Sequence, residues 1–328
     1  MFNTKCNEVI RITMTITICM VAGKVMGFAS PVYLALYPTI AMTKCRDYSW
    51  SGLVGMFYPV LLAASTALLV CNVFADHPFI IWTISLLFFD FMRRRAVTPQ
   101  AVGRMLMPTF NWILVVIFSI HTTASMPNRI HEILLSMAIT IVVAKLFVAM
   151  FPVTSKGEKS PVFKPKEVTY LNRLVSLGLI GGGVAFLMIV DLISATFCLV
   201  PVIAAATQFD RQSFIKTVNL RFVTQVGGCA VASVFIALMM GHQSVISFYT
   251  LILGSIIFLI SKWMCAEKGS NRDVHADALL ATMLPIQLYV GNVNLGMNST
   301  FLRAFELACT LAILFFLYHL TNRVTDHE

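Results

Sequence analysis

The chain has 328 residues, of which 58% are hydrophobic and only 12% are charged, and its mean hydropathy is +0.82. Repeated apolar runs between short basic loops exclude a soluble domain and indicate a polytopic helical membrane protein, because a helix satisfies its own backbone hydrogen bonds in lipid. The sequence lacks the ten-residue alternation of membrane-barrel strands. The eight cysteines have no CxxC or His-Cys spacing, so we expect no disulfide, no metal site and no cofactor.

The first apolar segment follows Lys5 and Arg11, a pattern shared with signal peptides, but the many later segments favour an uncleaved first helix. The later segments of the first half are expected at residues 30–43, 52–74, 78–92, 106–124 and 130–151. Those of the second half are expected at 172–190, 193–207, 222–240, 246–262, 278–292 and 304–321. We therefore predict an all-α membrane protein with about 10–12 transmembrane helices, some of them short or broken.

The apolar segments fall into two sets of six, separated by a polar stretch with four lysines and three prolines. Residues 1–151 then form a first membrane repeat, 152–171 a cytoplasmic linker and 172–328 a second membrane repeat. Because each set holds an even number of segments, both repeats would enter the membrane in the same direction and be parallel.

The basic residues predict the orientation in the membrane. With the N-terminus inside, 20 of the 24 Lys and Arg residues fall in cytoplasmic stretches, and only Lys24, Arg129 and Arg303 fall in outer loops. Lysine and arginine accumulate in cytoplasmic loops, so we expect both termini in the cytoplasm. This topology accounts for the net charge of +9, and no nucleic-acid partner is expected.

Two short apolar segments interrupted by proline occupy matching places in the two halves. The first, Ser30–Ala41, contains Pro31 and Pro38, and the second, Ser194–Ala205, contains Pro201. A proline inside a helix removes a backbone hydrogen bond and clashes with the preceding turn. Such paired, interrupted segments are the best pointer from sequence to the binding site of a transporter. The candidate pocket residues on these segments are the three prolines with Tyr33, Tyr37 and Phe197.

Proline and glycine give further matches between the halves. Pro108 and Pro285 are expected to open the fifth and eleventh segments, and Gly227-Gly228 is a loose echo of Gly52-x-x-Gly55. Small residues let membrane helices approach closely. The seventh segment carries such a small-residue face, made of Gly178, Gly181, Gly182 and Gly183.

An Arg-x-x-Glu pair opens the last segment of each half. The pair is Arg129 with Glu132 in the first half and Arg303 with Glu306 in the second. Residues three apart share one helix face, so each pair can form an ion pair. In a structural interpretation, each arginine keeps its glutamate charged and anchors a helix end. In a functional interpretation, the arginine contacts an anionic substrate and the glutamate carries a proton, because ionisable groups in a membrane are costly and therefore suggest function.

Lys24 and Asp191 each follow the first segment of their half and precede the broken segment. Either they are solvated loop charges, or they face each other across a pseudo-two-fold axis, with Lys24 contacting an anion and Asp191 taking part in proton coupling. Lys145 is interpreted as reaching the cytoplasmic headgroups. Asp90 is interpreted as the partner of one of the arginines at 93–95.

The fifth and eleventh segments are polar for membrane helices. Such side chains either hydrogen-bond to neighbouring helices or line a wet path, and both interpretations stay open. The candidate pocket residues are Asn111 and His121 in the fifth segment, and Gln287, Asn292 and Asn294 in and just after the eleventh.

The stretch from Val25 to Arg95 resembles the opening of the fusaric-acid-resistance and aromatic-acid-exporter superfamily of bacterial inner-membrane proteins. The resemblance rests on Ser30-Pro31-Val32-Tyr33, the run to Met42, the basic Lys44 and Arg46, and Gly52-x-x-Gly55 before a long apolar span. The second half repeats this layout from Ser194. Larger members carry a cytoplasmic domain after each membrane half, whereas this chain has only the linker and a short tail, so it resembles a compact subgroup.

The resemblance implies the inner-membrane component of an efflux system that exports small aromatic or anionic compounds together with a periplasmic membrane-fusion adaptor. The glutamates add the expectation of proton coupling. The sequence has no HExxH, GxSxG or Walker A motif, so we do not expect an enzyme or an ATP-driven pump. The expected partners are the lipid bilayer, a small-molecule substrate, the adaptor and a second copy of the chain.

Two other classes stay open. A major-facilitator-type carrier shares the six-plus-six topology, but the stretch Thr43–Ser51 lacks the glycine- and arginine-rich signature of that family. A scaffold that assembles an envelope complex would move no substrate across the membrane, whatever the gradient.

Overall fold

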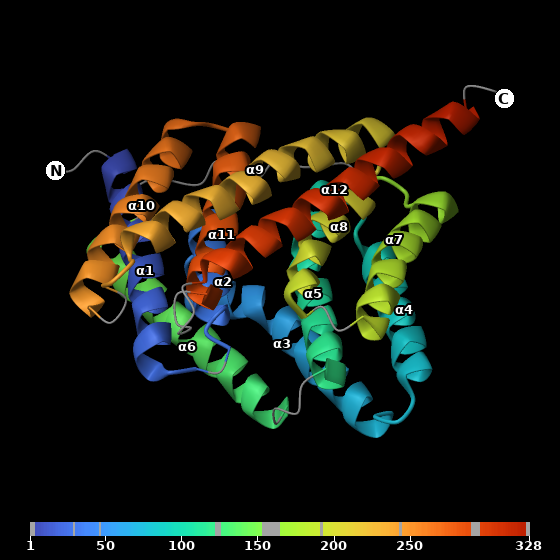
Figure 1. Cartoon of the computed structure of the whole chain (residues 1–328), viewed down its shortest axis with the longest axis horizontal. Helices are drawn as coiled ribbons and strands as arrows, with labels where there is room; N and C mark the ends of the chain where they lie inside the picture. The colour runs from blue at the N-terminus through green and yellow to red at the C-terminus, as the bar shows by residue number, and fades with distance from the viewer. Residues whose placement is uncertain are drawn as a thin grey trace. The chain divides into compact units, whose positions relative to one another are not determined.

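The computed structural model describes residues 4–28, 30–45, 47–121, 126–152, 165–190, 193–242, 245–289 and 296–325. Within these residues the chain forms twelve α-helices and one 3-10 helix and contains no strand (Figure 1). The helices are α1 (Thr4–Met26), α2 (Tyr33–Lys44), α3 (Trp50–Val73), α4 (Pro78–Arg95), α5 (Pro99–His121), α6 (Met126–Met150), α7 (Tyr170–Ile189), η1 (Ile193–Cys198), α8 (Leu199–Ala206), α9 (Arg211–Leu238), α10 (Ile246–Ala266), α11 (Ser270–Tyr289) and α12 (Met297–Thr325). The predicted all-α class is confirmed.

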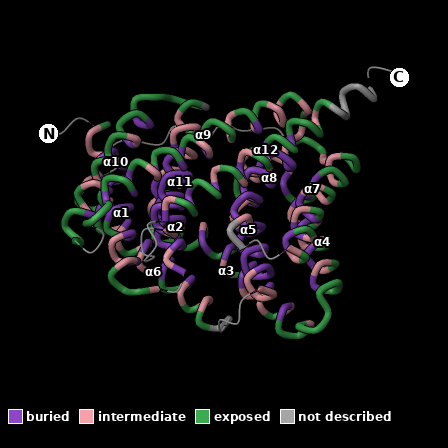
Figure 2. Tube along the Cα trace, in the orientation of Figure 1, coloured by how far each residue is buried: buried purple, intermediate pink, exposed green. Residues whose placement is uncertain are grey.

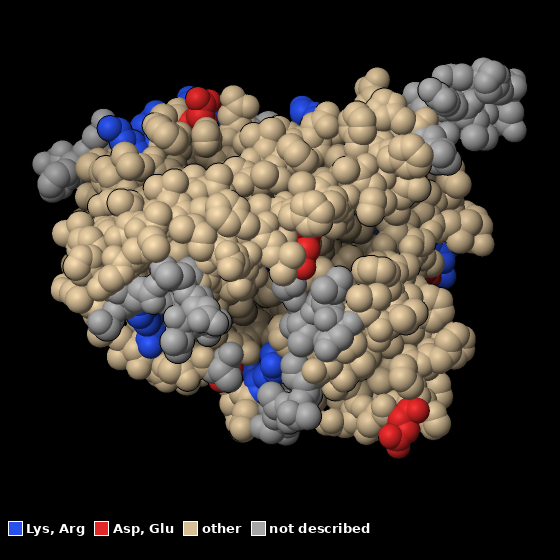
Figure 3. Space-filling view, in the orientation of Figure 1, with Lys and Arg blue, Asp and Glu red and all other residues tan. Residues whose placement is uncertain are grey.

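Eight helices in the described part of the chain are long and apolar enough to cross a membrane. They are α1, α3, α5, α6, α7, α9, α10 and α12. Figure 3 shows that most of the face in view carries neither acidic nor basic side chains. Several such helices in one chain make this a multi-pass membrane protein.

Four helices begin well before the predicted residues. The starts of α5, α9, α11 and α12 were expected at residues 106, 222, 278 and 304, and the helices begin at 99, 211, 270 and 297. Hydropathy marks only the apolar part of a helix, whereas the backbone hydrogen bonds continue through polar turns as well. As a consequence Pro108 and Pro285 lie inside α5 and α11, and the prediction that they open these helices was wrong.

The helices form two compact units. Unit 1 comprises Met1–Phe57, His131–Ser160 and Val223–Phe305, and unit 2 comprises Tyr58–Ile130, Pro161–Phe222 and Glu306–Glu328. Each unit therefore takes helices from both halves of the chain. The predicted membrane repeats follow chain order, which is a different division, and they stay a prediction.

The same packing scheme occurs in both units. In unit 1, α1 and α11 each pack against both α2 and α10; in unit 2, α7 and α5 each pack against both α8 and α4 (Figure 1). The schemes coincide when α7 takes the place of α1, α8 that of α2, α4 that of α10 and α5 that of α11. Each of these matches joins helices at equivalent positions of the two halves, as expected for an internal repeat.

Residues on the buried helix faces agree with this correspondence. In unit 2, Gly181 of α7 lies against Leu86 of α4; in unit 1, Gly254 of α10 lies against Thr17 of α1. The glycine belongs to α7 in unit 2 but to α10 in unit 1, so it does not lie on corresponding helices. Each pair of helices nevertheless has one small residue where the two meet, which allows a close approach. The corresponding helices α10 and α4 both bury residues at intervals of four. These are Tyr249, Leu253, Ile257 and Ser261 in α10, and Ile81, Ser85, Phe89 and Arg93 in α4.

Only part of the predicted glycine face of α7 makes close contacts. A Cβ atom at Gly181 would clash with Leu86, and one at Gly183 would lie 2.6 Å from Leu199 Cδ2. At Gly178 and Gly182 an added Cβ would have no neighbour within 4 Å in the described part of the chain. The close contacts are therefore made by Gly181 toward α4 and by Gly183 toward α8.

The two proline-containing segments form short helices, as predicted, and the structure shows that these helices are buried. The twelve residues of α2 extend about 18 Å, less than the roughly 30 Å of a bilayer core. Residues Tyr33–Met42 are buried, as is all of α8 (Figure 2). Pro38 lies inside α2, whereas Pro201 stands in the first turn of α8, where a missing N–H costs little.

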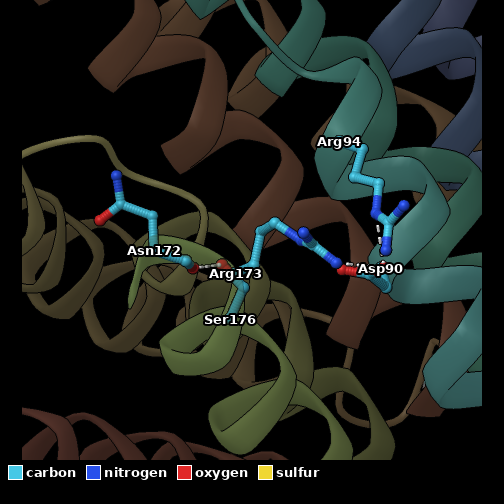
Figure 4. Close-up of polar contacts among 5 residues, drawn as sticks. All are labelled: Asp90, Arg94, Asn172, Arg173 and Ser176. Carbon is cyan, nitrogen blue, oxygen red and sulfur yellow. Dashed lines mark hydrogen bonds and ion pairs between the residues drawn. The ribbon is translucent and has the colours of Figure 1, made fainter. Parts of the chain in front are cut away.

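Asp90 of α4 connects two helices of unit 2. Its carboxylate accepts two hydrogen bonds of 2.8 Å from Arg173 of α7 and forms an ion pair of 2.7 Å with Arg94 (Figure 4). The predicted pairing with one of the following arginines is confirmed for Arg94, but Arg173 was missed. The side chain of Asp90 is 14% exposed and that of Arg173 is 24% exposed. A two-pronged contact of this kind fixes both position and orientation.

We expect Asp90→Asn to lower the midpoint of thermal unfolding by several degrees, because it leaves Arg173 without its carboxylate partner. The control is Asp210→Asn, which removes the ion pair with Lys166. Both side chains of this ion pair are more than half exposed, and exposed ion pairs contribute little to the free energy of unfolding. Thermal unfolding in detergent compares the two variants, and equal midpoints would contradict a structural role for Asp90.

Candidate functional site

The start of α2 is the centre of the candidate site, and it belongs to unit 1. Tyr33 and Tyr37 are both buried, and their rings stack with centroids 5.5 Å apart. Phe57 meets Tyr37 edge-on at 5.4 Å. Residues one helical turn apart face the same side, so α2 presents an aromatic face made of two of the predicted pocket residues.

A carboxylate accepts a hydrogen bond from the backbone just before this helix begins. The Ser30 N–H, three residues before α2 begins, donates a hydrogen bond of 2.9 Å to Oε2 of Glu132 in α6. Negative charge is favourable at a helix N-terminus, where backbone N–H groups lack partners within the helix. The structure therefore joins the predicted proton-coupling residue Glu132 to the first broken segment.

A polar network lies in the same unit, between α1, α10 and α11. The Gln287 amide donates to the Met20 carbonyl over 3.2 Å, and the Tyr249 hydroxyl donates to Gln287 Oε1 over 3.4 Å. The Lys24 ammonium group lies 4.3 Å from the centroid of the Tyr249 ring, within the range of a cation–π interaction. The predicted residues Lys24 and Gln287 are thus brought together through a third residue.

The absence of a side chain at Gly23 allows this arrangement. A Cβ atom there would lie 2.6 Å from Nε2 of Gln287 and 3.3 Å from Leu34 of α2. Gly23, Lys24 and Ser30 belong to the last turn of α1 and the connection to α2. The amide network and the Glu132 contact therefore lie at the end of unit 1 where α1 passes into α2.

Tyr249 was missed by the sequence analysis. It is 1% exposed and lies near the start of α10, in a largely apolar segment. The signal was available, because a buried tyrosine hydroxyl normally finds a hydrogen-bond partner. A lone tyrosine in a membrane segment nevertheless has no spacing pattern that would single it out.

The equivalent region of unit 2 is built around an aromatic contact. Phe197 of η1 packs against Phe110 of α5 with ring centroids 5.6 Å apart, and Pro201 is buried in α8. The Asn111 side chain donates to the Met107 carbonyl of its own helix over 3.0 Å. Where unit 1 has an amide, Gln287, beside its broken segment, unit 2 has the ring of Phe110.

Two more candidate residues connect elements of unit 2. Nε2 of His121, at the end of α5, lies 2.8 Å from the Leu187 carbonyl of α7. The Arg129 guanidinium lies 4.2 Å from the centroid of the Phe118 ring. Both contacts hold helix ends in place.

The remaining candidates are placed as follows. Arg303, at 1% exposure, is buried in the part of α12 that belongs to unit 1, and Glu306 begins the part that belongs to unit 2. Arg129 and Glu132 are also divided between the units, but the other way round: Arg129 belongs to unit 2 and Glu132 to unit 1. The Arg-x-x-Glu ion pairs stay a prediction. Asp191, Asn292 and Asn294 lie outside the described residues.

Residues 8–147 match a family described as a protein of unknown function (DUF2955). The matched region runs from α1 nearly to the end of α6 and includes α2, Glu132 and the proline-containing helix α5. No curated protein and no solved structure matches the chain.

Proposed function

We propose that this protein is a secondary transporter of the bacterial inner membrane that exports small aromatic or anionic compounds in a proton-coupled reaction. In this proposal it belongs to the fusaric-acid-resistance and aromatic-acid-exporter superfamily, on the pattern from Ser30 to Gly55. Both termini face the cytoplasm, and a periplasmic membrane-fusion adaptor continues the export path.

One observation carries the proposal. The short, buried helix α2 has an aromatic face, and the segment just before it is hydrogen-bonded to a glutamate carboxylate. Helices too short to cross the bilayer form the binding sites of many transporters, because their ends supply partial charges inside the membrane. In unit 1 the Ser30 N–H and the Glu132 carboxylate meet at such an end. In unit 2 η1 and α8 occupy the equivalent place, where Phe197 packs against the ring of Phe110.

The chemistry of the unit 1 site fits an aromatic anion. Lys24 supplies positive charge beside Tyr249, and α2 supplies the stacked rings of Tyr33 and Tyr37. Glu132 can take up and release a proton at the same site. Export driven by protons that enter the cell requires exchange, so the site would bind the anion on one side of the membrane and the proton on the other, in turn.

The test is transport by the purified full-length chain in lipid vesicles. Labelled benzoate and 4-hydroxybenzoate serve as probes, with benzamide as a neutral aromatic control. We expect an imposed pH gradient to drive accumulation of the carboxylates above the level in empty vesicles, with benzamide unaffected. Equal fluxes with and without protein, under every gradient, would overturn the proposal and support the scaffold. Accumulation driven by Na⁺ alone would refute the proton coupling.

A further inference from the structure

An apolar groove lies between α9 and α12 in unit 2. It has a volume of about 290 Å³ and is lined by Val218, Asn219 and Phe222 from α9 and by Leu311, Ala312 and Phe315 from α12. Asn219, Phe222, Ala312 and Phe315 are exposed, so the groove opens to the surface of the protein. All but one of its lining side chains are apolar.

The two helices close the groove at one end by a polar contact. Arg211 of α9 donates a hydrogen bond of 3.0 Å to the Tyr318 carbonyl of α12, and its guanidinium lies 5.1 Å from the centroid of that ring. Phe214 stacks on the same tyrosine. The next turns of the two antiparallel helices, Val218 with Phe315 and Phe222 with Leu311, line the groove. It therefore runs from a basic, aromatic end into an apolar region.

Three exposed residues of α9 become less polar along the helix. Lys216, Asn219 and Phe222 follow one another at intervals of three residues, so each lies about 4.5 Å further along the axis and about 60° further around it. The order is a charge, an amide and an aromatic ring. A phospholipid presents its phosphate, its ester groups and its acyl chain in the same order over similar distances.

We propose that the groove between α9 and α12 binds one anionic phospholipid. Its acyl chain lies against Phe222, Leu311 and Phe315, its ester carbonyls accept from the Asn219 amide, and its phosphate pairs with Lys216 beside Arg211. Basic residues next to an apolar cleft between membrane helices are a recognised arrangement for binding anionic lipid headgroups. A zwitterionic lipid offers the same acyl chain but lacks the net negative charge.

Native mass spectrometry of the full-length chain, released from mild detergent, tests this site. The chain is titrated with dioleoylphosphatidylglycerol or with dioleoylphosphatidylcholine. We expect one tightly retained anionic lipid, and loss of that adduct in Ala312→Phe, which fills the groove. Lys216→Gln should reduce the preference for the anionic lipid about fivefold, as expected for one basic residue at a lipid headgroup.

Matched controls are Ala237→Phe, an exposed alanine of α9 outside the groove, and Lys262→Gln, an exposed lysine of α10. Both should retain the lipid as the unmodified chain does. Three results would overturn the proposal: equal retention of the two lipids, an adduct that survives Ala312→Phe, or a dimer of the chain that Ala312→Phe dissociates. The last would assign the groove to a second copy.

Discussion

Glu132→Gln is expected to reduce accumulation driven by a pH gradient to the level of empty vesicles while leaving the protein folded. Glutamine keeps an oxygen that accepts the Ser30 N–H, so the hydrogen bond at the entrance of α2 survives. It cannot take up or release a proton, however. The variant thus separates a structural role for this side chain from a role in coupling.

Two further variants make this prediction specific. Glu267→Gln changes an exposed glutamate just after α10 and should transport normally. Glu306→Gln tests the matching position of the second half. The measurement is accumulation of labelled benzoate, combined with thermal unfolding of each purified variant. Undiminished accumulation in Glu132→Gln would show that this carboxylate only holds the segment that precedes α2, and that another residue carries the coupled proton.

Gly228→Ala is expected to destabilise the protein, because α9 and α11 meet at this glycine. An added Cβ atom would lie 2.6 Å from Ala281 Cβ, 2.8 Å from the Ala281 carbonyl carbon and 3.0 Å from the Thr282 nitrogen. Two of these are backbone atoms, which cannot rotate away as the end of a side chain can. Forcing extra atoms into such a contact costs about 1–3 kcal/mol.

The neighbouring glycine provides the matched control. A Cβ atom at Gly227 would have no neighbour within 4 Å in the described part of the chain. Alanine also favours a helix interior over glycine by about 1 kcal/mol, so Gly227→Ala should be neutral or stabilising. Thermal unfolding in detergent distinguishes the two substitutions. If both variants unfolded at the same temperature, the close approach of α9 and α11 would not contribute to stability.

Local chemistry was sufficient to predict much of the helical structure. The segment expected at 30–43 is the helix Tyr33–Lys44, because ten consecutive apolar or small residues between polar flanks define its position. The predicted start of α9 was eleven residues too late. Arg211, Lys216 and Arg221 lower the mean hydropathy of this stretch to the level typical of a loop. Backbone hydrogen bonding extends a helix into such polar turns regardless of side-chain transfer energy.

The sequence singled out candidate site residues one by one, but it did not show which of them contact one another. Lys24 and Gln287 were expected to matter because polar groups in a membrane are expensive. Their connection through Tyr249 could not be predicted, because α10 reaches α1 only through tertiary packing. Similarly, the hydrogen bond from the Ser30 N–H to Glu132 joins two elements that only tertiary packing brings together. The pairing of Glu132 with Arg129, three residues away, stays a prediction.

By itself the sequence determined the membrane class, the helices, the two short segments containing proline and a correspondence between the halves. All of these depend on transfer energies and on backbone geometry, which act over a few neighbouring residues. Only the tertiary structure decided that α1 and α2 pack with α10 and α11, while α7 and α8 pack with α4 and α5. That choice depends on where small residues such as Gly181 and Gly254 let two helices approach, and such complementarity exists only between surfaces that meet in space.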